Sequence, residues 1–305
     1  MGETMPHQNR GLSDLAFIER VKRLALIALF SDDELMELLV LKGGNALDIV
    51  YNVAQRSSLD LDFSIESKFE AEALPGIQAK VQAALESTFQ LAGFKVFDVG
   101  LVERPRRVTP DMADFWGGYR IEFKIIELSK IAERTLNPDQ ARREAAIVGP
   151  DQKRTFMIDI SKFEYCKPKR QAEVDHYTIY VYTPEMLVVE KIRAICQQMP
   201  EYVALVKDHG ARARARDFFD IYTLAEAFKV NLAGEAMASL VRSVFSAKRV
   251  PLRLVGEIGR YRDYHRQDFV EVQQTVKPGT DLKPFDFYFE YVVAMCRSLK
   301  ALWDE

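Results

Sequence analysis

Apolar and polar residues follow each other in two different rhythms along this chain, one helical and one strand-like. Residues 13–30 carry apolar side chains at helical spacing, and Ser13 is the predicted N-cap of this helix. A second helix is predicted directly afterwards, because Ser31 and Glu34 stand in the spacing of a capping box. The chain is therefore expected to begin with two consecutive helices.

Strand-like alternation dominates the next part of the chain. Helices are predicted among the strands over residues 45–53, over residues 74–92 with Gly93 as the stop signal, and after Asn137 as a cap. This succession indicates an α/β arrangement. The predicted strands are residues 38–42, 60–65, 94–103, 117–126, 154–163 and 177–183.

The pattern changes character near Tyr182. Thr183 followed by Pro184 is a typical helix start, and helical spacing then prevails to the end of the chain. We therefore expect an α/β domain over residues 1–182 and an α-helical domain over residues 183–305.

Composition is that of an ordinary globular protein. Of the 305 residues, 48% are hydrophobic and 29% charged, and the formal net charge of −3 does not indicate a dedicated nucleic-acid binder. The three cysteines are far apart and predicted to be free thiols, and the four scattered histidines suggest no zinc site. Neither a signal peptide nor a membrane-spanning run is visible, so a cytoplasmic protein without membrane contact is expected.

The most informative stretch, residues 41–63, ends in two aspartates one residue apart. In a strand, Asp60 and Asp62 share one face, while Leu61 and Phe63 point to the core. Two close carboxylates repel each other unless a cation lies between them. Mg²⁺ usually takes one or two carboxylates together with substrate phosphates. The pair therefore predicts a metal site, although such a pair alone is more often a solvated strand face.

A glycine turn precedes the aspartates. Gly43 and Gly44 lead into a predicted helix, whose N-terminal amide groups form a site for phosphate. Arg56 and either Ser57 or Ser58 are expected to add hydrogen-bond donors. Such a turn is common by itself, but its place just before the acid pair indicates a metal and a nucleoside triphosphate.

The succession Lys-Gly-Gly-x-Ala-Leu and then Arg-x-Ser-x-Asp-Leu-Asp-Phe resembles the AbiEii family of bacterial nucleotidyltransferase toxins, which includes the MenT toxins. The resemblance implies the DNA polymerase β-like nucleotidyltransferase fold, with a mixed sheet, followed by a helical domain. It also implies an NTP substrate and Mg²⁺ or Mn²⁺ as cofactor. Asn45 stands where the family more often has Thr or Ser. The expected nucleotide-binding residues are Gly43, Gly44, Asn45, Arg56, Ser58 and Lys191.

Two-metal phosphoryl transfer usually requires a third carboxylate on a neighbouring strand. Asp159 is the expected one, because Ile158 and Ile160 on either side of it point to the core. Glu122 is the alternative by the same alternation, and the resemblance favours Asp159. The expected metal ligands are therefore Asp60, Asp62 and Asp159.

Two later helices carry charged residues beside apolar ones. Lys191 lies against an apolar stripe, from which it either extends to solvent or reaches a buried partner. Asp217 and Asp220 share one face of a later helix. Glu190-Lys191 and Arg216-Asp217-x-x-Asp220 resemble the later AbiEii motifs, which implies that Lys191 contacts the nucleotide phosphates and that Asp217 is an essential acid. Asp217 either acts as a base for the acceptor hydroxyl or orients Lys191.

Local basic segments are candidates for contact with nucleic acid, although each is also typical of a solvated surface. The family resemblance implies an RNA acceptor, with the tRNA 3′ end as the expected site, and a cognate antitoxin protein as partner. The segments are residues 104–107, 167–170, 207–216 and 260–266.

The sequence thus predicts transfer of a nucleoside monophosphate from an NTP to RNA, as the toxin of a toxin–antitoxin system. The expected catalytic residues are Asp60, Asp62, Lys191 and Asp217. Two alternatives remain open. One is nucleotidylation or phosphorylation of a protein hydroxyl, and the other is a non-catalytic module that binds nucleotide or RNA.

Overall fold

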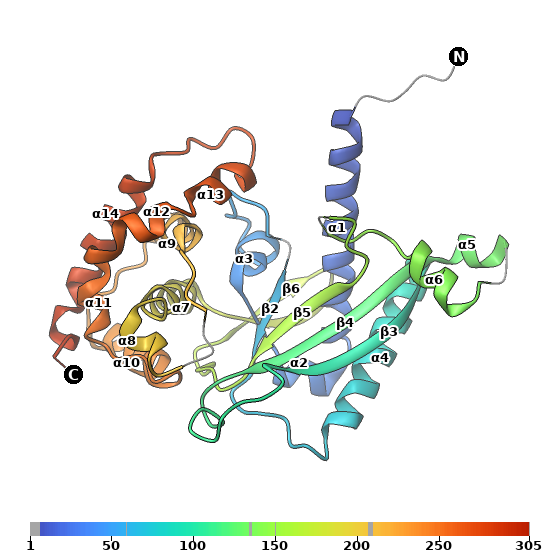
Figure 1. The fold of residues 1–305 in the computed structure, drawn as a ribbon, viewed down its shortest axis with the longest axis horizontal. Coiled ribbons are helices and arrows are strands. Elements are labelled where there is room, and N and C mark those ends of the chain that lie inside the picture. Colours follow the sequence, from blue (N-terminus) through green and yellow to red (C-terminus); the bar gives the residue numbers. More distant parts are fainter. Residues whose placement is uncertain (1–6, 59, 134–135, 150, 207–209, 305) are drawn as a thin grey trace.

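A seven-stranded mixed sheet forms the N-terminal half of the molecule, and helices dominate the rest (Figure 1). The computed structural model describes the chain except for residues 1–6, 59, 134–135, 150, 207–209 and 305. The strands are β1 Val40–Lys42, β2 Leu61–Ser64, β3 Phe94–Arg104, β4 Gly118–Glu127, β5 Phe156–Ser161, β6 Arg170–Val174 and β7 Tyr177–Val181.

The strand order in the sheet is β3-β4-β5-β2-β1-β7-β6. Strand β2 pairs antiparallel with β1 and parallel with β5, so it lies at the centre of the sheet. The predicted α/β fold with a mixed sheet and a helical C-terminal region is confirmed. Strand β6 was not predicted, because its sequence Arg-Gln-Ala-Glu-Val has little apolar alternation.

The helices before the last strand and those after it pack against different parts of the molecule. Helices α1 and α4 pack on each other and on the sheet, whereas α7 packs against α9, α10 and α11 in the C-terminal half (Figure 1). The first group is α1 His7–Phe30, α2 Asp33–Leu38, α3 Gly43–Asn45 with the π-helical turn Ala46–Val50, α4 Leu74–Leu91, α5 Leu128–Glu133 and α6 Pro138–Glu144. The second is α7 Pro184–Cys196, α8 Pro200–Val203, α9 Ala215–Phe228, α10 Glu235–Ser246, α11 Leu254–Glu257, α12 Arg262–Arg266, α13 Phe269–Thr275 and α14 Phe285–Cys296, with 3₁₀ turns at Ile258–Tyr261 and Arg297–Leu302.

Two predicted helix caps are wrong and two are confirmed. Helix α1 already begins at His7, so Ser13 lies inside it. Helix α2 is capped by Asp32, whose carboxylate accepts from the Leu35 amide at 2.9 Å. Ser31 directly follows α1, and its hydroxyl instead donates to the Ala28 carbonyl. The predicted caps that precede α6 and α7 are confirmed: Asn137 and Thr183.

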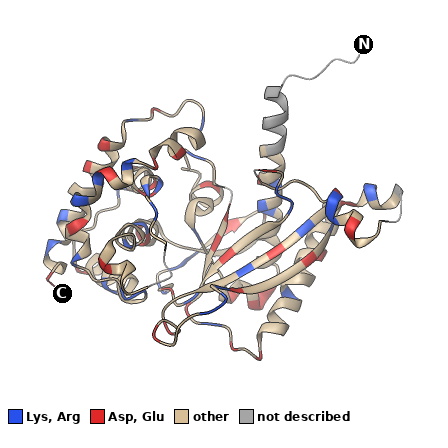
Figure 2. Cartoon of the chain, in the orientation of Figure 1, with Lys and Arg blue, Asp and Glu red and all other residues tan. Residues whose placement is uncertain are grey.

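Alternation along β4 and β5 separates an apolar face from a polar one. Ile121, Phe123 and Ile158 are fully buried on the first face, while Arg120 and Asp159 lie on the second. Figure 2 shows charged residues of both signs on these strands. The polar face leads toward the C-terminal helices.

One continuous cluster of buried apolar residues runs from α1 through the sheet to the last helices. The division into residues 1–182 and 183–305 therefore stays a prediction, although the last strand does end at Val181 and α7 begins at Pro184. No helix in the described part of the chain is long and apolar enough to cross a membrane.

Candidate active site

A cavity of about 1130 Å³ lies where the sheet meets α7 and α9. The described residues that line it include ten Lys or Arg and eight Asp or Glu. Because the two signs nearly balance, the groups that lack a counter-charge are the ones that indicate a ligand. The predicted site residues that line this cavity are Gly43, Gly44, Arg56, Ser58, Asp60, Asp62, Asp159, Lys191 and Asp217.

The glycine turn presses directly against two of these side chains. Gly43 has φ +70°, and a Cβ on it would lie 2.6 Å from Oδ2 of Asp62. A Cβ on Gly44 would lie 2.7 Å from Oγ of Ser58. Any larger residue would therefore clash with the Asp62 or Ser58 side chain, and only glycine lets the main chain approach these two side chains so closely. The turn leads into α3, so main-chain amides lie at the same place.

Asp60 and Asp62 lie side by side on the cavity wall. Leu61 and Phe63, which alternate with them, are fully buried, as the strand pattern predicts. Within the described residues, neither aspartate has a hydrogen bond or ion pair to its carboxylate. Burial raises the pKa of Asp62 to about 7; the charge of Lys42 opposes this shift, and the charges of Asp60 and Asp159 add to it. The described residues therefore offset the charge of this pair only in part, through Lys42.

This arrangement fits a hard divalent cation bound by two carboxylates and completed by substrate phosphates. The described residues contain no group of three or more His, Cys, Asp or Glu side chains placed to hold a metal by themselves. Asp159 is the nearest addition, since it is paired in register with Asp62, but its carboxylate accepts two hydrogen bonds from Arg120. Glu122 instead accepts from Arg104 at 3.4 Å and is not among the cavity residues. The geometry therefore favours Asp159 over Glu122 as the third acid.

Lys191 reaches buried partners rather than solvent. Its Nζ donates to Asp217 at 3.0 Å and to Asp220 at 2.8 Å. Asp220 also accepts from Nε and Nη2 of Arg56 at 2.9 and 2.6 Å. Burial alone would lower the pKa of Lys191, but the charges of Asp220 and Asp217 outweigh it and raise that pKa. The network keeps Lys191 charged at the cavity wall, and of the two roles predicted for Asp217 it favours orienting this lysine.

The sequence profile of one family, described as the nucleotidyl transferase AbiEii toxin of a type IV toxin–antitoxin system, matches residues 24–291. The chain belongs to this family. It is therefore a nucleotidyltransferase, and membership implies a nucleotide substrate and a cognate antitoxin. Members of such a family generally use an NTP and a divalent metal, which agrees with the acid pair and the glycine turn.

The solved structures that match this chain are distant from it in sequence. A Helicobacter pylori protein described as a candidate nucleotidyltransferase is 17% identical over 98% of each chain, with a TM-score of 0.47. JHP933 from Helicobacter pylori is 16% identical over 99% of this chain and 95% of that one, with a TM-score of 0.45. An antigenic nucleotidyltransferase-like protein from Paracoccidioides brasiliensis is 11% identical over 75% and 92%, with a TM-score of 0.36. No curated protein matches the sequence.

A second buried charge network in this AbiEii-family protein was missed by the sequence analysis. Lys42 donates to Glu190 at 3.1 Å and to Glu164 at 3.4 Å, and Arg193 donates to Glu164 at 2.7 Å. Burial would raise the pKa of Glu164, but the charges of Arg193, Lys248 and Lys42 lower it. The only available signal was position: Lys42 adjoins the glycine turn, and Glu190 and Arg193 flank Lys191.

Asn45 is the one predicted nucleotide-binding residue that does not line the cavity. It is fully buried, its Oδ1 accepts from Lys22 at 3.1 Å, and its Nδ2 donates to the main-chain carbonyl of Asp60. Lys22, also fully buried, donates to the carbonyl of Ser58 at 2.7 Å. The amide therefore fixes the loop that carries Ser58 and Asp60, and direct contact with nucleotide stays a prediction.

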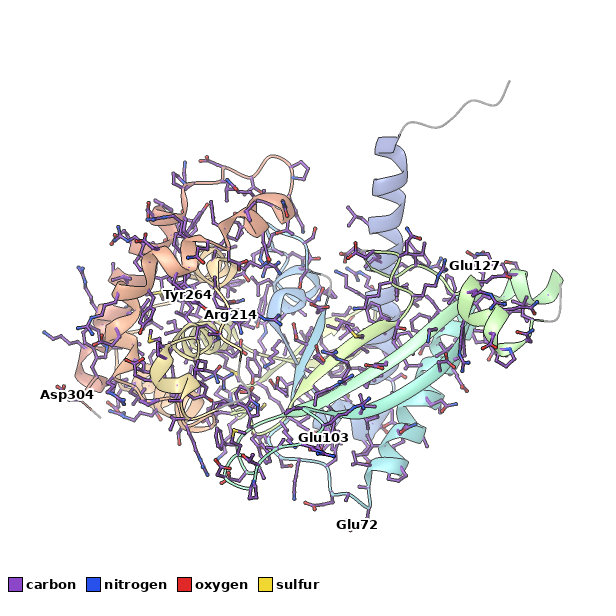
Figure 3. All side chains as sticks on the ribbon, in the orientation of Figure 1. Glu72, Glu103, Glu127, Arg214, Tyr264 and Asp304 are labelled. Carbon is purple, nitrogen blue, oxygen red and sulfur yellow. The ribbon has the colours of Figure 1, made fainter. Side chains whose placement is uncertain are left out.

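The four basic segments divide into two groups. Arg104 and the arginines of the segment before α9 line the cavity, whereas the segments at 167–170 and 260–266 do not. In Figure 3, Arg214 lies between the C-terminal helices and the sheet. Arg214 approaches Asp217 at 3.5 Å, and Arg216 pairs with Glu271. Residues 207–209 of the same segment lie outside the described residues.

Proposed function

We propose that this AbiEii-family nucleotidyltransferase moves a nucleoside monophosphate from an NTP to a hydroxyl of RNA, at a tRNA 3′ end, with Mg²⁺ or Mn²⁺ held by Asp60 and Asp62. One observation carries the proposal. Two carboxylates that have no hydrogen-bond or ion-pair partner among the described residues line one wall of the cavity, where the glycine turn lies directly against Asp62, and the charged Lys191 lies on the other wall.

Each wall has its own part in the proposed reaction. Main-chain amides after Gly43 and the hydroxyl of Ser58 receive phosphate oxygens, and Lys191 neutralises phosphate charge. A divalent cation at the acid pair would supply neutralisation at the reacting phosphate. The acceptor hydroxyl then attacks the α-phosphorus and pyrophosphate leaves, so catalysis comes mainly from positioning and charge compensation.

The arginine-lined part of the cavity supports an RNA acceptor. The guanidinium groups there suit the phosphates of a single-stranded end, for which positive charge along a groove is the usual recognition. Four of the cavity arginines also have an Nε that is buried without a hydrogen-bond partner among the described residues. They are Arg104, Arg193, Arg214 and Arg216.

The test mixes purified protein with Mg²⁺, total tRNA and each α-labelled nucleotide in turn. We expect label on RNA from one nucleotide, loss of label in Asp60→Ala, and retention in Glu122→Gln, a carboxylate on the same sheet that is not among the cavity residues. A parallel reaction with γ-labelled nucleotide separates nucleotidyl from phosphoryl transfer. Label on protein, or none on any acceptor, would contradict the proposal.

A further inference from the structure

Asp159 is held by an arginine on the neighbouring strand. Nε of Arg120 donates to Oδ1 at 2.7 Å, and Nη2 donates to Oδ2 at 3.1 Å, so both carboxylate oxygens are engaged. The two residues face each other in the β4–β5 pairing, and both line the cavity. Such a forked pair is specific in geometry as well as favourable in energy.

The same carboxylate adjoins the acid pair. Asp159 is the register partner of Asp62 in the parallel pairing of β2 and β5. Partners in neighbouring strands present their side chains on the same face of a sheet. A cation between Asp60 and Asp62 would thus have Asp159 as its next ligand, yet the guanidinium of Arg120 already lies against that group.

Exposure separates this ion pair from the one on the opposite wall. The side chains of Arg120 and Asp159 are 27% and 40% exposed, whereas those of Arg56 and Asp220 are 10% and 3% exposed. A partly exposed pair is easier to separate than a buried one, because water competes for its charged groups. The Arg120–Asp159 pair can therefore open at a smaller cost than the Arg56–Asp220 pair.

We infer that Arg120 is a positioning residue that competes with the divalent cation for Asp159. The inference rests on the proposed function, since it presumes that Asp60 and Asp62 bind the cation. Without nucleotide, Asp159 stays with Arg120, and the cation has two carboxylate ligands. When an NTP enters, its phosphate oxygens take over the guanidinium, and Asp159 turns to the cation. The cation then binds more tightly to the protein that already holds nucleotide than to the free protein. The reverse holds for the nucleotide, because such a coupling is reciprocal.

The test measures Mn²⁺ affinity of the full-length protein by electron paramagnetic resonance, without nucleotide and with a non-hydrolysable NTP. We expect Arg120→Met to bind Mn²⁺ about fivefold to tenfold more tightly without nucleotide, which is the lower end of the usual range of such a coupling. The gain should vanish in the Asp159→Asn background. In Arg120→Met, added nucleotide should strengthen Mn²⁺ binding less than in the unaltered protein.

Lys124→Met is the matched control. Lys124 lies on the same strand, two alternations from Arg120, pairs with Asp98 at 3.0 Å, and is not among the cavity residues. Lys124→Met removes one positive charge, as Arg120→Met does. Unchanged Mn²⁺ affinity in Lys124→Met therefore shows that the loss of a positive charge elsewhere on the strand does not cause the gain seen in Arg120→Met. If Arg120→Met does not fold, Arg120→Gln removes the same charge with a polar side chain and is expected to give the same gain.

The outcomes separate the two proposals. Mn²⁺ binding that is lost in Asp60→Ala but unchanged in Arg120→Met overturns this inference alone. So does a gain that survives in the Asp159→Asn background, because Arg120 would then act on the cation without Asp159. Failure of both the unaltered protein and Arg120→Met to bind Mn²⁺ would overturn the proposed metal site and this inference with it.

Discussion

The two walls of the cavity treat their charges in opposite ways. Around Lys191, the buried charged groups Arg56, Asp217 and Asp220 are paired, and one carboxylate, that of Asp220, serves both Lys191 and Arg56. On the sheet wall, Asp60 and Asp62 face the cavity without a partner among the described residues. The buried groups of the first wall are therefore paired within the protein itself. Under the proposed function, the acid pair of the second wall gains its partners only when a cation and phosphates bind.

This difference assigns separate tasks to the two walls. A buried, fully paired network holds its side chains in one arrangement, and breaking it is costly. An unpaired acid pair costs folding free energy instead, which a bound cation returns. Changes on the sheet wall should therefore affect catalysis and metal binding first, and changes on the Lys191 wall should affect stability first.

The largest expected effect is on catalysis. Asp62→Asn keeps the size of the side chain but removes the charge that a cation needs, so we expect nucleotide transfer to fall by about 10³-fold or more. Initial rates with labelled nucleotide measure this, and circular dichroism verifies the fold. Activity within tenfold of the unaltered protein would contradict the metal role of Asp62.

The next effect is on stability and tests the paired wall. Asp220→Ala leaves Arg56 and Lys191 buried without their shared carboxylate, so we expect a loss of about 3–5 kcal/mol in the free energy of unfolding. Glu226→Ala on the same helix is the control, because Glu226 is exposed and loses a hydrogen bond from Tyr291, so a change of about 1 kcal/mol is expected. Urea denaturation of the unaltered protein and of the two variants measures these changes in the free energy of unfolding. Equal stability of both variants would mean that the network is not rigid.

Local patterns in the sequence predicted the unpaired wall better than the paired one. Asp60, Asp62 and the glycine turn lie within one short stretch, so strand alternation and a helix start were enough to place them. Lys191 was placed on a helix face, but its partners come from α9, 26 and 29 residues away, and spacing alone could not choose between solvent and a buried partner.

Contacts between distant strands and helices escaped the sequence entirely. Arg120 and Asp159 are 39 residues apart, and only the β4–β5 register brings them together. Lys22 reads as a polar position on a helix, because nothing local shows that Asn45 and a carbonyl of a distant loop lie beside it. The capping error at Ser31 has the opposite origin: the local signal was real, but Asp32 offered a competing carboxylate one residue later.

A smaller effect is the pH dependence of the free energy of unfolding. It tests how much stability the protein loses because the acid pair on the sheet wall is charged and unpaired. The pKa of Asp62 is raised to about 7 in the folded chain, above the ordinary aspartate value near 4. The folded state therefore binds this proton more tightly, so the free energy of unfolding falls as pH rises from about 4 to 7. With EDTA at pH 8 we expect Asp62→Asn to be more stable than the unaltered protein by about 2–4 kcal/mol, and near equality only at about pH 4 or below.

A group with the opposite shift is the control for that measurement. Hydrogen bonding from Arg142 and Lys124 lowers the pKa of Asp98 to about 2. Its contribution is therefore present above pH 4 and lost as pH falls toward 2, so Asp98→Asn should be less stable than the unaltered protein at pH 8. Saturating Mg²⁺ should reverse the order for Asp62→Asn alone. If Asp62→Asn shows no gain at pH 8, the acid pair carries no folding cost.

The smallest expected effect concerns Asn45 and Lys22, whose hydrogen bonds hold the loop behind the sheet wall. Asn45→Ser keeps a polar group but cannot reach both Lys22 and the Asp60 carbonyl, so we expect a loss of about 1 kcal/mol in stability and a drop of a few fold in transfer. Lys22→Met should have a similar effect, and the double variant should lose less than the sum, because the two residues share one hydrogen bond. Additive losses would show that each acts alone. If stability falls but kcat is unchanged, the loop keeps its place without the hydrogen bonds of Asn45 and Lys22. Asp60 is then held in position by the strand β2 that follows it.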